Sequence, residues 1–135
     1  MESHSITAVT TLDRSHYLTK VYADGHFIYA DEPLEAGGTN EGMSPMVLLL
    51  ASLGSCTAIT VRMYADRKGM QLEGIEIHAA LNPSTAEGDP AIISQQVSFT
   101  GKLNEQERMR LSQIAEKCPV HKLLSRPIQI LTTTV

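Results

Sequence analysis

The feature that most constrains the fold of this 135-residue chain is an uncharged stretch of 20 residues, spanning positions 42–61. A Ser-Pro pair at 44–45 is typical of a helix start, with serine as N-cap and proline in the first helical position. The Arg-Lys-Gly run at 67–69 is typical of a helix end. We therefore predict one helix over 45–68, ~36 Å long at the usual rise per residue. A helix of that length crosses a whole domain of this size.

The uncharged stretch is also long enough to cross a bilayer. However, only twelve of its twenty residues are apolar, and the rest are Ser, Thr, Gly and Pro. It also lacks basic and aromatic residues at both ends, which anchor membrane spans. We therefore expect no membrane span, but a central helix covered by a sheet or by another subunit.

The remaining segments alternate between strand-like and helix-like patterns. Asp24-Gly25 lies between two strand-like runs, which indicates a hairpin, and Asn104 and Glu107 have the spacing of a capping box. Strands are expected at 4–13, within 16–31 on both sides of the hairpin turn, and at 72–81, 91–102 and 127–135; loops at 32–44 and 82–90; and helices at 45–68, 104–118 and as a short turn at 119–125. The predicted class is α+β, with the order β-β-β-α-β-β-α-α-β, in one domain over residues 1–135.

Charge and terminal composition narrow the functional classes. The net charge is -4, and the eleven Lys and Arg residues are scattered, so we expect no nucleic-acid partner. The N-terminal MESHSITAVTT has no Lys or Arg and no apolar core of a secretory signal. We expect a cytoplasmic protein, in which two cysteines are not ordinarily a structural disulfide.

The two cysteines, Cys56 and Cys118, leave three interpretations open. A cysteine on an apolar helix face is commonly a small core residue. A reactive Cys56 needs a cation from elsewhere in the fold, because an apolar wall raises a thiol pKa and neither Arg62 nor Arg67 lies on its face. The spacing of Cys118 and His121 also permits a metal ligand pair, although a single pair is weak evidence.

Cys118 differs from Cys56 in preceding a proline directly. Pro119 is suited to begin a helical turn, and the free N–H groups of such a turn favour a thiolate. Both cysteines end or occupy apolar helix faces, so we expect them to point into one core and to meet there.

Four motifs in fixed order resemble the osmotically inducible protein C (OsmC) and organic hydroperoxide resistance family. They are the loop GGTNEGMSP (37–45), the helix segment LLASLGSC (49–56), the helix exit RKGMQLE (67–73) and the segment CPVH (118–121). The resemblance extends over nearly the whole chain. It implies an intertwined α+β homodimer, with antiparallel strands around a long central helix and with active sites between the subunits.

The resemblance also implies a chemistry for the thiols. The matching positions are Cys56, which attacks an organic hydroperoxide and becomes a sulfenic acid, and Cys118, which resolves it as a disulfide. An external dithiol then reduces the disulfide, and no cofactor is required. The family has an arginine near the first sulfur, and Arg14, 42 residues before Cys56, has the spacing of the organic hydroperoxide resistance branch.

The chain departs from the family at one catalytic position. A glutamate that orients the arginine normally follows the loop proline by one or two residues, where this chain has Met46 and Val47. Glu41, in the preceding loop, is the nearby substitute. Two hypotheses follow: a cytoplasmic, homodimeric thiol peroxidase of the oxidative stress response, or a dimeric binding module for an apolar ligand with little peroxidase activity.

Overall fold

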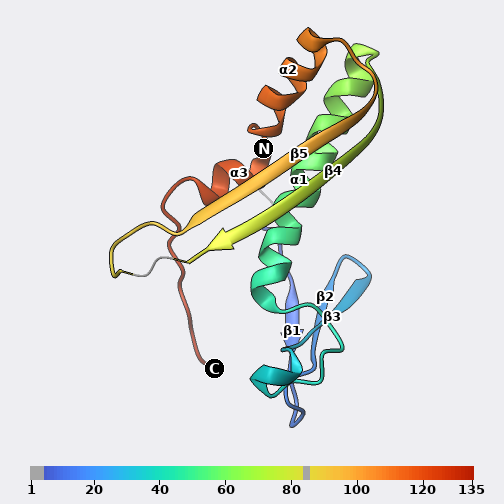
Figure 1. The fold of residues 1–135 in the computed structure, drawn as a ribbon. Coiled ribbons are helices and arrows are strands. Elements are labelled where there is room, and N and C mark those ends of the chain that lie inside the picture. Colours follow the sequence, from blue (N-terminus) through green and yellow to red (C-terminus); the bar gives the residue numbers. More distant parts are fainter. Residues whose placement is uncertain (1–4, 84–85) are drawn as a thin grey trace. The chain divides into compact units, whose positions relative to one another are not determined.

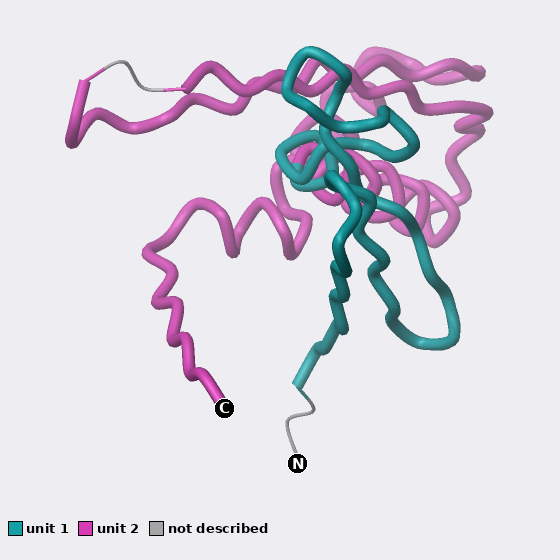
Figure 2. Tube along the Cα trace, turned by 90° about the horizontal axis from the view of Figure 1, so that it is seen from below, with its two compact units in different colours: residues 1–49 teal, residues 50–135 magenta. Residues whose placement is uncertain are grey.

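The computed structural model describes residues 5–83 and 86–135. His4, at the start of the predicted strand 4–13, and residues 84–85 of the predicted loop 82–90 lie outside the described residues. The chain divides into two compact units, residues 1–49 and residues 50–135, drawn in two colours in Figure 2. Each unit is described by itself.

The first unit contains a three-stranded antiparallel sheet in the order β1-β2-β3. Its strands are β1 (Val9–Thr11), β2 (Thr19–Ala23) and β3 (His26–Ala30). Asp24 and Gly25 have φ angles of 51° and 80°, and two consecutive positive φ values are the requirement of the tight turns that suit strand twist. The predicted hairpin is confirmed, and the first strand is shorter than predicted.

The glycine-rich loop after β3 folds around the buried side chain of Asp31. A short 3-10 helix, η1 (Leu34–Ala36), ends at Gly37, whose φ of 90° is left-handed. A Cβ on Gly38 would collide with the carbonyl oxygen of Glu32. The second glycine of the motif therefore lets the loop close over its own beginning.

The long helix α1 (Pro45–Lys68) has the predicted bounds. Ser44 acts as its N-cap, because the Ser44 hydroxyl oxygen accepts a hydrogen bond from the Val47 N–H at 3.4 Å. By length and composition α1 could cross a membrane, with mean hydropathy 1.7 in its most apolar window and 17% of that window buried. Its buried residues, Leu53, Thr57, Val61 and Ala65, recur every four residues and form one stripe.

In the second unit, two long antiparallel strands form a curved ribbon, β4 (Gln71–Asn82) and β5 (Ile92–Lys102) (Figure 1). Ile75 pairs with Phe99 and Ile77 with Val97, and these half-buried apolar residues alternate with exposed ones along each strand. The core joins the half-buried face of this ribbon to α1 and to α2 (Glu105–Ala115), through Val61, Ala65, Leu72, Leu111, Ile114 and Ala115. The buried stripe of α1 therefore packs against β4, β5 and α2.

Two predictions for the C-terminal part need correction. The second helix ends at Ala115 rather than at 118, because the N–H groups of Glu116 and Lys117 bond three residues back and close the helix. Cys118 is extended and begins a separate helix, α3 (Pro119–Leu124). The strand predicted at 127–135 does not form within the described chain, since alternation alone makes no strand without a neighbouring strand to pair with. From β1 to α3 the element order is as predicted.

Candidate functional site

The structure brings the two predicted thiols together in the second unit. Both cysteines are free, and the Cys118 side chain lies close enough to the Cys56 thiol to raise its pKa. Cys56 is half-buried on α1, whereas Cys118 is fully buried. One sulfur is therefore accessible and the other is enclosed behind it.

The start of α3 places backbone N–H groups at both sulfurs. A residue before proline favours an extended backbone, and Cys118 has φ -69° and ψ 146° there. Its side chain caps the helix, accepting a hydrogen bond from the His121 N–H at 3.2 Å. The Val120 N–H acts on the Cys56 thiol and lowers its pKa. The prediction that Cys118 lies near free N–H groups is thus confirmed, and the same helix end also reaches Cys56.

The surroundings of Cys56 act on its thiol in opposite directions. Burial raises the pKa of Cys56 most, and the neighbouring Cys118 also raises it. The Val120 N–H and the Thr60 side chain lower it, because each hydrogen bond favours the charged sulfur. The balance leaves the Cys56 pKa above its ordinary value, so the described neighbours do not make Cys56 a strong nucleophile at neutral pH.

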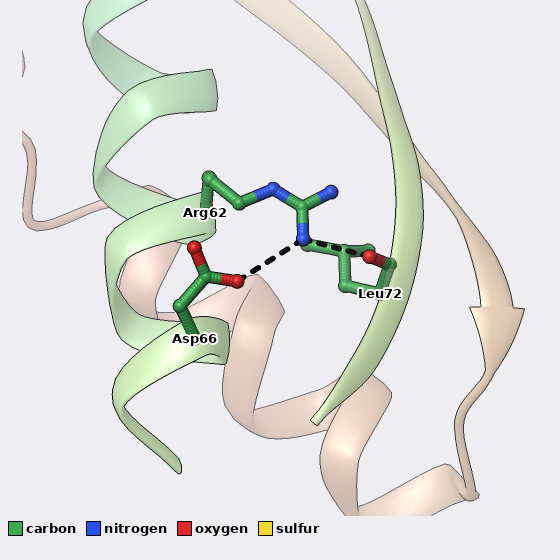
Figure 3. Close-up of polar contacts among 3 residues, drawn as sticks. All are labelled: Arg62, Asp66 and Leu72. Atoms are coloured by element: carbon green, nitrogen blue, oxygen red, sulfur yellow. Dashed lines mark hydrogen bonds and ion pairs between the residues drawn. The ribbon is translucent and has the colours of Figure 1, made fainter. Parts of the chain in front are cut away.

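The arginines of α1, which were predicted to lie off the Cys56 face, have other partners. Arg62 donates to the Leu72 carbonyl oxygen at 2.7 Å and to the Asp66 carboxylate at 3.3 Å (Figure 3). Arg67 lies over the Tyr64 ring, 5.4 Å from its centroid. Arg62 therefore ties the helix to β4, and a cation for Cys56 must come from another part of the fold.

Two polar residues that were not predicted from the sequence form a hydrogen-bonded pair, and one of them, Thr57, contacts Cys118. Thr57 is fully buried, and its hydroxyl oxygen lies 3.6 Å from the Cys118 sulfur. Gln95, on β5, lies within 3.4 Å of the same hydroxyl. The available signal was a polar residue at a core-facing position of β5, between Ile93 and Val97.

A cavity of about 520 Å³ opens beside this cluster in the second unit. Its lining mixes apolar side chains with hydroxyl, amide and imidazole groups: Leu53, Ala91, Ile93, Gln95, Val97, Ser112, Ala115, Glu116, His121, Leu124 and Ser125. Gln95 therefore contacts both the cavity and Thr57. No three His, Cys, Asp or Glu side chains of residues 5–83 and 86–135 group as a metal site.

Arg14 and Glu41 both belong to the first unit. Arg14 is exposed in a turn next to Ser15, whose N–H bonds to the Asp13 carboxylate at 2.8 Å. Glu41 is exposed, and its carboxylate lies 2.7 Å from the Thr39 hydroxyl oxygen. The catalytic roles of Arg14 and Glu41 remain predictions.

Asp31, which the sequence analysis also missed, connects the segments that carry these two residues. Its carboxylate accepts hydrogen bonds from the N–H groups of Tyr17, Glu32 and Glu41 and from the Thr39 hydroxyl. The Thr39 hydroxyl, followed by these N–H groups, holds the pKa of Asp31 well below its usual range. Asp31 thus fixes the turn after Arg14 to the loop that carries Glu41.

The orienting carboxylate of the resembling family is absent at the start of α1. Met46 and Val47 occupy its two usual positions, and they are 60% and 46% exposed. Within the second unit the site contains two neighbouring thiols, N–H donors and a buried hydroxyl.

Comparisons with known proteins agree with this geometry. A sequence model of the family described as OsmC-like protein matches residues 38–133. No curated protein matches the chain.

Solved structures share the fold. An OsmC-like protein from Mycoplasma pneumoniae is similar with a TM-score of 0.77 and 18% identity, covering 92% of this chain and 89% of that one. A putative osmotic stress induced and detoxification response protein from Psychrobacter arcticus 273-4 has a TM-score of 0.72 and 22% identity, with 90% of each chain covered. An organic hydroperoxide resistance protein from Elizabethkingia anophelis has a TM-score of 0.66 and 17% identity, over 90% and 89% of the two chains. The motifs, the fold and the family match together show that this chain belongs to the OsmC-like protein family.

Proposed function

We propose that the protein is a thiol-dependent peroxidase that reduces organic hydroperoxides. The observation that carries the proposal is the pair of neighbouring thiols, in which Cys56 is half-buried and Cys118 is fully buried. The more accessible sulfur is the one that a peroxide can reach. The second sulfur can form a disulfide with it only if the two lie close together. Organic hydroperoxide resistance proteins among the structural relatives support the same substrate class.

The reaction divides into two thiol steps. The Cys56 thiolate attacks the peroxide, the O–O bond breaks, and Cys56 becomes a sulfenic acid while an alcohol leaves. Cys118 then attacks the Cys56 sulfur, the S–O bond breaks, and water leaves as the disulfide forms. An external dithiol returns the disulfide to two thiols. No cofactor takes part.

Because the Cys56 pKa is raised, the first step needs a positive charge near the sulfur. We propose Arg14 for this role and Glu41 as the acid that orients it. An arginine stays charged at every working pH, and the Asp31 hydrogen bonds give its turn a fixed geometry.

We further propose that the protein is a cytoplasmic homodimer of the oxidative stress response, with neither membrane nor nucleic acid as partner. Ile59 and Met63, one turn apart on α1, are 53% and 66% exposed. Exposed large apolar side chains on a helix of this length favour burial against another copy. The unpaired segment 127–135, with Ile130 82% exposed, is also suited to pair with a strand of a second chain.

The test uses reduced protein and cumene hydroperoxide. We expect peroxide loss together with an intact mass lower by two hydrogens, as a disulfide requires. Cys56→Ser is expected to consume no peroxide. Cys118→Ser is expected to gain one oxygen and to react with dimedone, which traps sulfenic acids.

Ser55→Ala is the matched control, because Ser55 is an exposed neighbour of Cys56 whose hydroxyl bonds to its own helix. It is expected to keep the wild-type rate. Peroxide consumption by Cys56→Ser at the wild-type rate would refute the peroxidase.

A binding module for an apolar ligand is the second candidate function. The apolar pair Met46 and Val47 and the raised pKa of Cys56 favour it. Val47→Glu separates the two, since it restores a carboxylate at the usual position. If the protein is a peroxidase limited by the missing carboxylate, Val47→Glu increases peroxide turnover. If it is a binding module, Val47→Glu still turns over no peroxide.

A further inference from the structure

The fully buried sulfur of Cys118 must find its stabilising partners within the protein. No water solvates a thiolate at a fully buried position, and an unsolvated charge is costly. The His121 N–H, at 3.2 Å, is one donor to this sulfur. The second group within hydrogen-bond distance is the Thr57 hydroxyl, at 3.6 Å.

The Thr57 hydroxyl has one hydrogen and three neighbouring acceptors. It lies 2.9 Å from the Leu53 carbonyl oxygen, 3.4 Å from the Gln95 amide oxygen and 3.6 Å from the Cys118 sulfur. With Cys118 as a thiol, the hydroxyl donates to Leu53, and its free lone pairs accept the S–H. With Cys118 as a thiolate, rotation about one bond turns the hydrogen to the sulfur. The same oxygen therefore serves both charge states of Cys118.

Gln95 keeps this oxygen in place. Its amide nitrogen lies 3.3 Å from the Thr57 hydroxyl oxygen and its amide oxygen 3.4 Å away. Gln95 is half-buried on β5, in a series of otherwise apolar half-buried positions, Ile93, Val97 and Phe99. A polar group at such a position is costly unless it is bonded, and Thr57 is its bonded partner.

We propose that Thr57, held by Gln95, is a positioning residue that stabilises the Cys118 thiolate as it resolves the Cys56 sulfenic acid. The inference rests on the proposed function and assigns the second step to residues outside the cysteine pair. In that step the Cys118 sulfur bonds to the Cys56 sulfur and the S–O bond breaks. The hydroxide that leaves and the proton lost by Cys118 together form water, so no further reagent is needed.

Other titratable groups near Cys118 are few among the described residues. Cys56 faces it from α1, and His121 from α3, where the ring Nδ1 lies 3.4 Å from the Ser125 hydroxyl. Glu116, two positions before Cys118, is exposed. The test therefore removes Cys56 in one arm and keeps His121 and Glu116 unchanged in every variant.

The first arm follows one turnover with cumene hydroperoxide, measuring sulfenic acid by dimedone trapping and disulfide by intact mass. In Thr57→Val, which replaces the hydroxyl by a methyl group, sulfenic acid is expected to form near the wild-type rate. Disulfide formation is expected to slow by about tenfold or more, as for loss of a hydrogen bond to a charged group. Gln95→Leu is expected to slow the same step by less, and Thr57→Ser, which keeps the hydroxyl, to restore it.

Thr100→Val is the matched control, since Thr100 is an exposed threonine of β5. It is expected to leave both rates unchanged. If Thr57→Val forms the disulfide as fast as wild type, or if Thr100→Val slows it equally, the inference is wrong while the peroxidase stands.

The second arm needs no peroxide. In Cys56→Ser protein, Cys118 is the only thiol, and its S–H stretching band is measured by infrared spectroscopy. Adding Thr57→Val is expected to move the band to higher frequency, because the S–H group loses the Thr57 oxygen as its acceptor. An unchanged band overturns the role of Thr57. If wild type forms neither sulfenic acid nor disulfide, the proposed function fails, and this arm alone still decides whether Thr57 holds Cys118.

Discussion

Cys56 lies between groups that favour its thiolate and groups that oppose it. Thr60, one turn further along α1, lowers its pKa by a side-chain hydrogen bond, and Cys118 raises it. Thr60 and Cys118 both contact Cys56, so substituting each one alone measures its separate effect on the Cys56 pKa.

Removing these two groups is expected to shift the Cys56 pKa in opposite directions. Thr60→Val raises the pKa, because the thiolate loses a donor, and its alkylation at neutral pH slows. Cys118→Ala lowers the pKa, because the thiol loses its acceptor and a like charge. Thiolate ultraviolet absorbance against pH measures both. Shifts of the same sign would show that the hydrogen bonds around Cys56 are assigned wrongly.

Asp31 stabilises the first unit only while it is ionised. Its folded pKa is lowered, first by the Thr39 hydroxyl, so its contribution is complete above the ordinary carboxyl pKa of about 3.9. The contribution is lost as the pH falls below that value toward the folded pKa. Asp31→Asn is therefore expected to have a lower melting temperature than wild type at pH 6. The difference between the two melting temperatures is expected to narrow toward pH 3. Asp24→Asn, in the exposed hairpin turn, is the control. A difference in melting temperature between Asp31→Asn and wild type that does not change with pH would contradict the stabilising role of the ionised Asp31.

At the scale of elements, the start of α2 has the clearest local signal in the chain. The Asn104 side chain accepts from the Glu107 N–H at 2.8 Å, and the Glu107 carboxylate accepts from the Asn104 N–H at 3.0 Å. Asn104→Ala is expected to lower the free energy of unfolding by about 1 kcal/mol. Chemical denaturation measures the change. Gln106→Ala, at an exposed position of the same turn, is expected to change it little, and equal losses would exclude a capping effect.

Elements with local signals could be predicted from the sequence, and those that depend on distant partners could not. The Asp24-Gly25 turn, the Ser44 cap and the Asn104 box each act within four residues, and each is confirmed. Residues 127–135 alternate like a strand, but pairing depends on a segment that the sequence pattern cannot specify. The end of α2 at Ala115 is set locally instead, because the N–H groups of Glu116 and Lys117 bond three residues back and Cys118 caps the next helix.

The candidate site shows the same division. Cys56 and Cys118 could be identified because a chain with two cysteines offers few thiols. Thr57 and Gln95 were missed because their partners lie 61 and 38 residues away. Asp31 was missed because its four donors come from separate loop positions. Side-chain networks of this kind become visible only after the elements are packed.

At the scale of the whole molecule, the exposed side of α1 is what a second copy would have to cover. Ile59 and Met63 are 53% and 66% exposed, although the helix is apolar enough to cross a membrane. In a symmetric homodimer one substitution enters the interface twice. A residue such as Met63 near the axis would then approach its own counterpart.

Met63→Glu is therefore expected to dissociate the proposed dimer. Two unpaired carboxylates close together in an apolar interface cost several kcal/mol, which raises the dimer Kd by more than about a hundredfold. Sedimentation equilibrium measures the change. Met109→Glu, on α2 and 65% exposed, is the matched control and is expected to leave the mass unchanged. If wild type is a monomer at micromolar concentration, or if Met63→Glu keeps the dimer, then α1 is not the interface and its apolar side needs another partner.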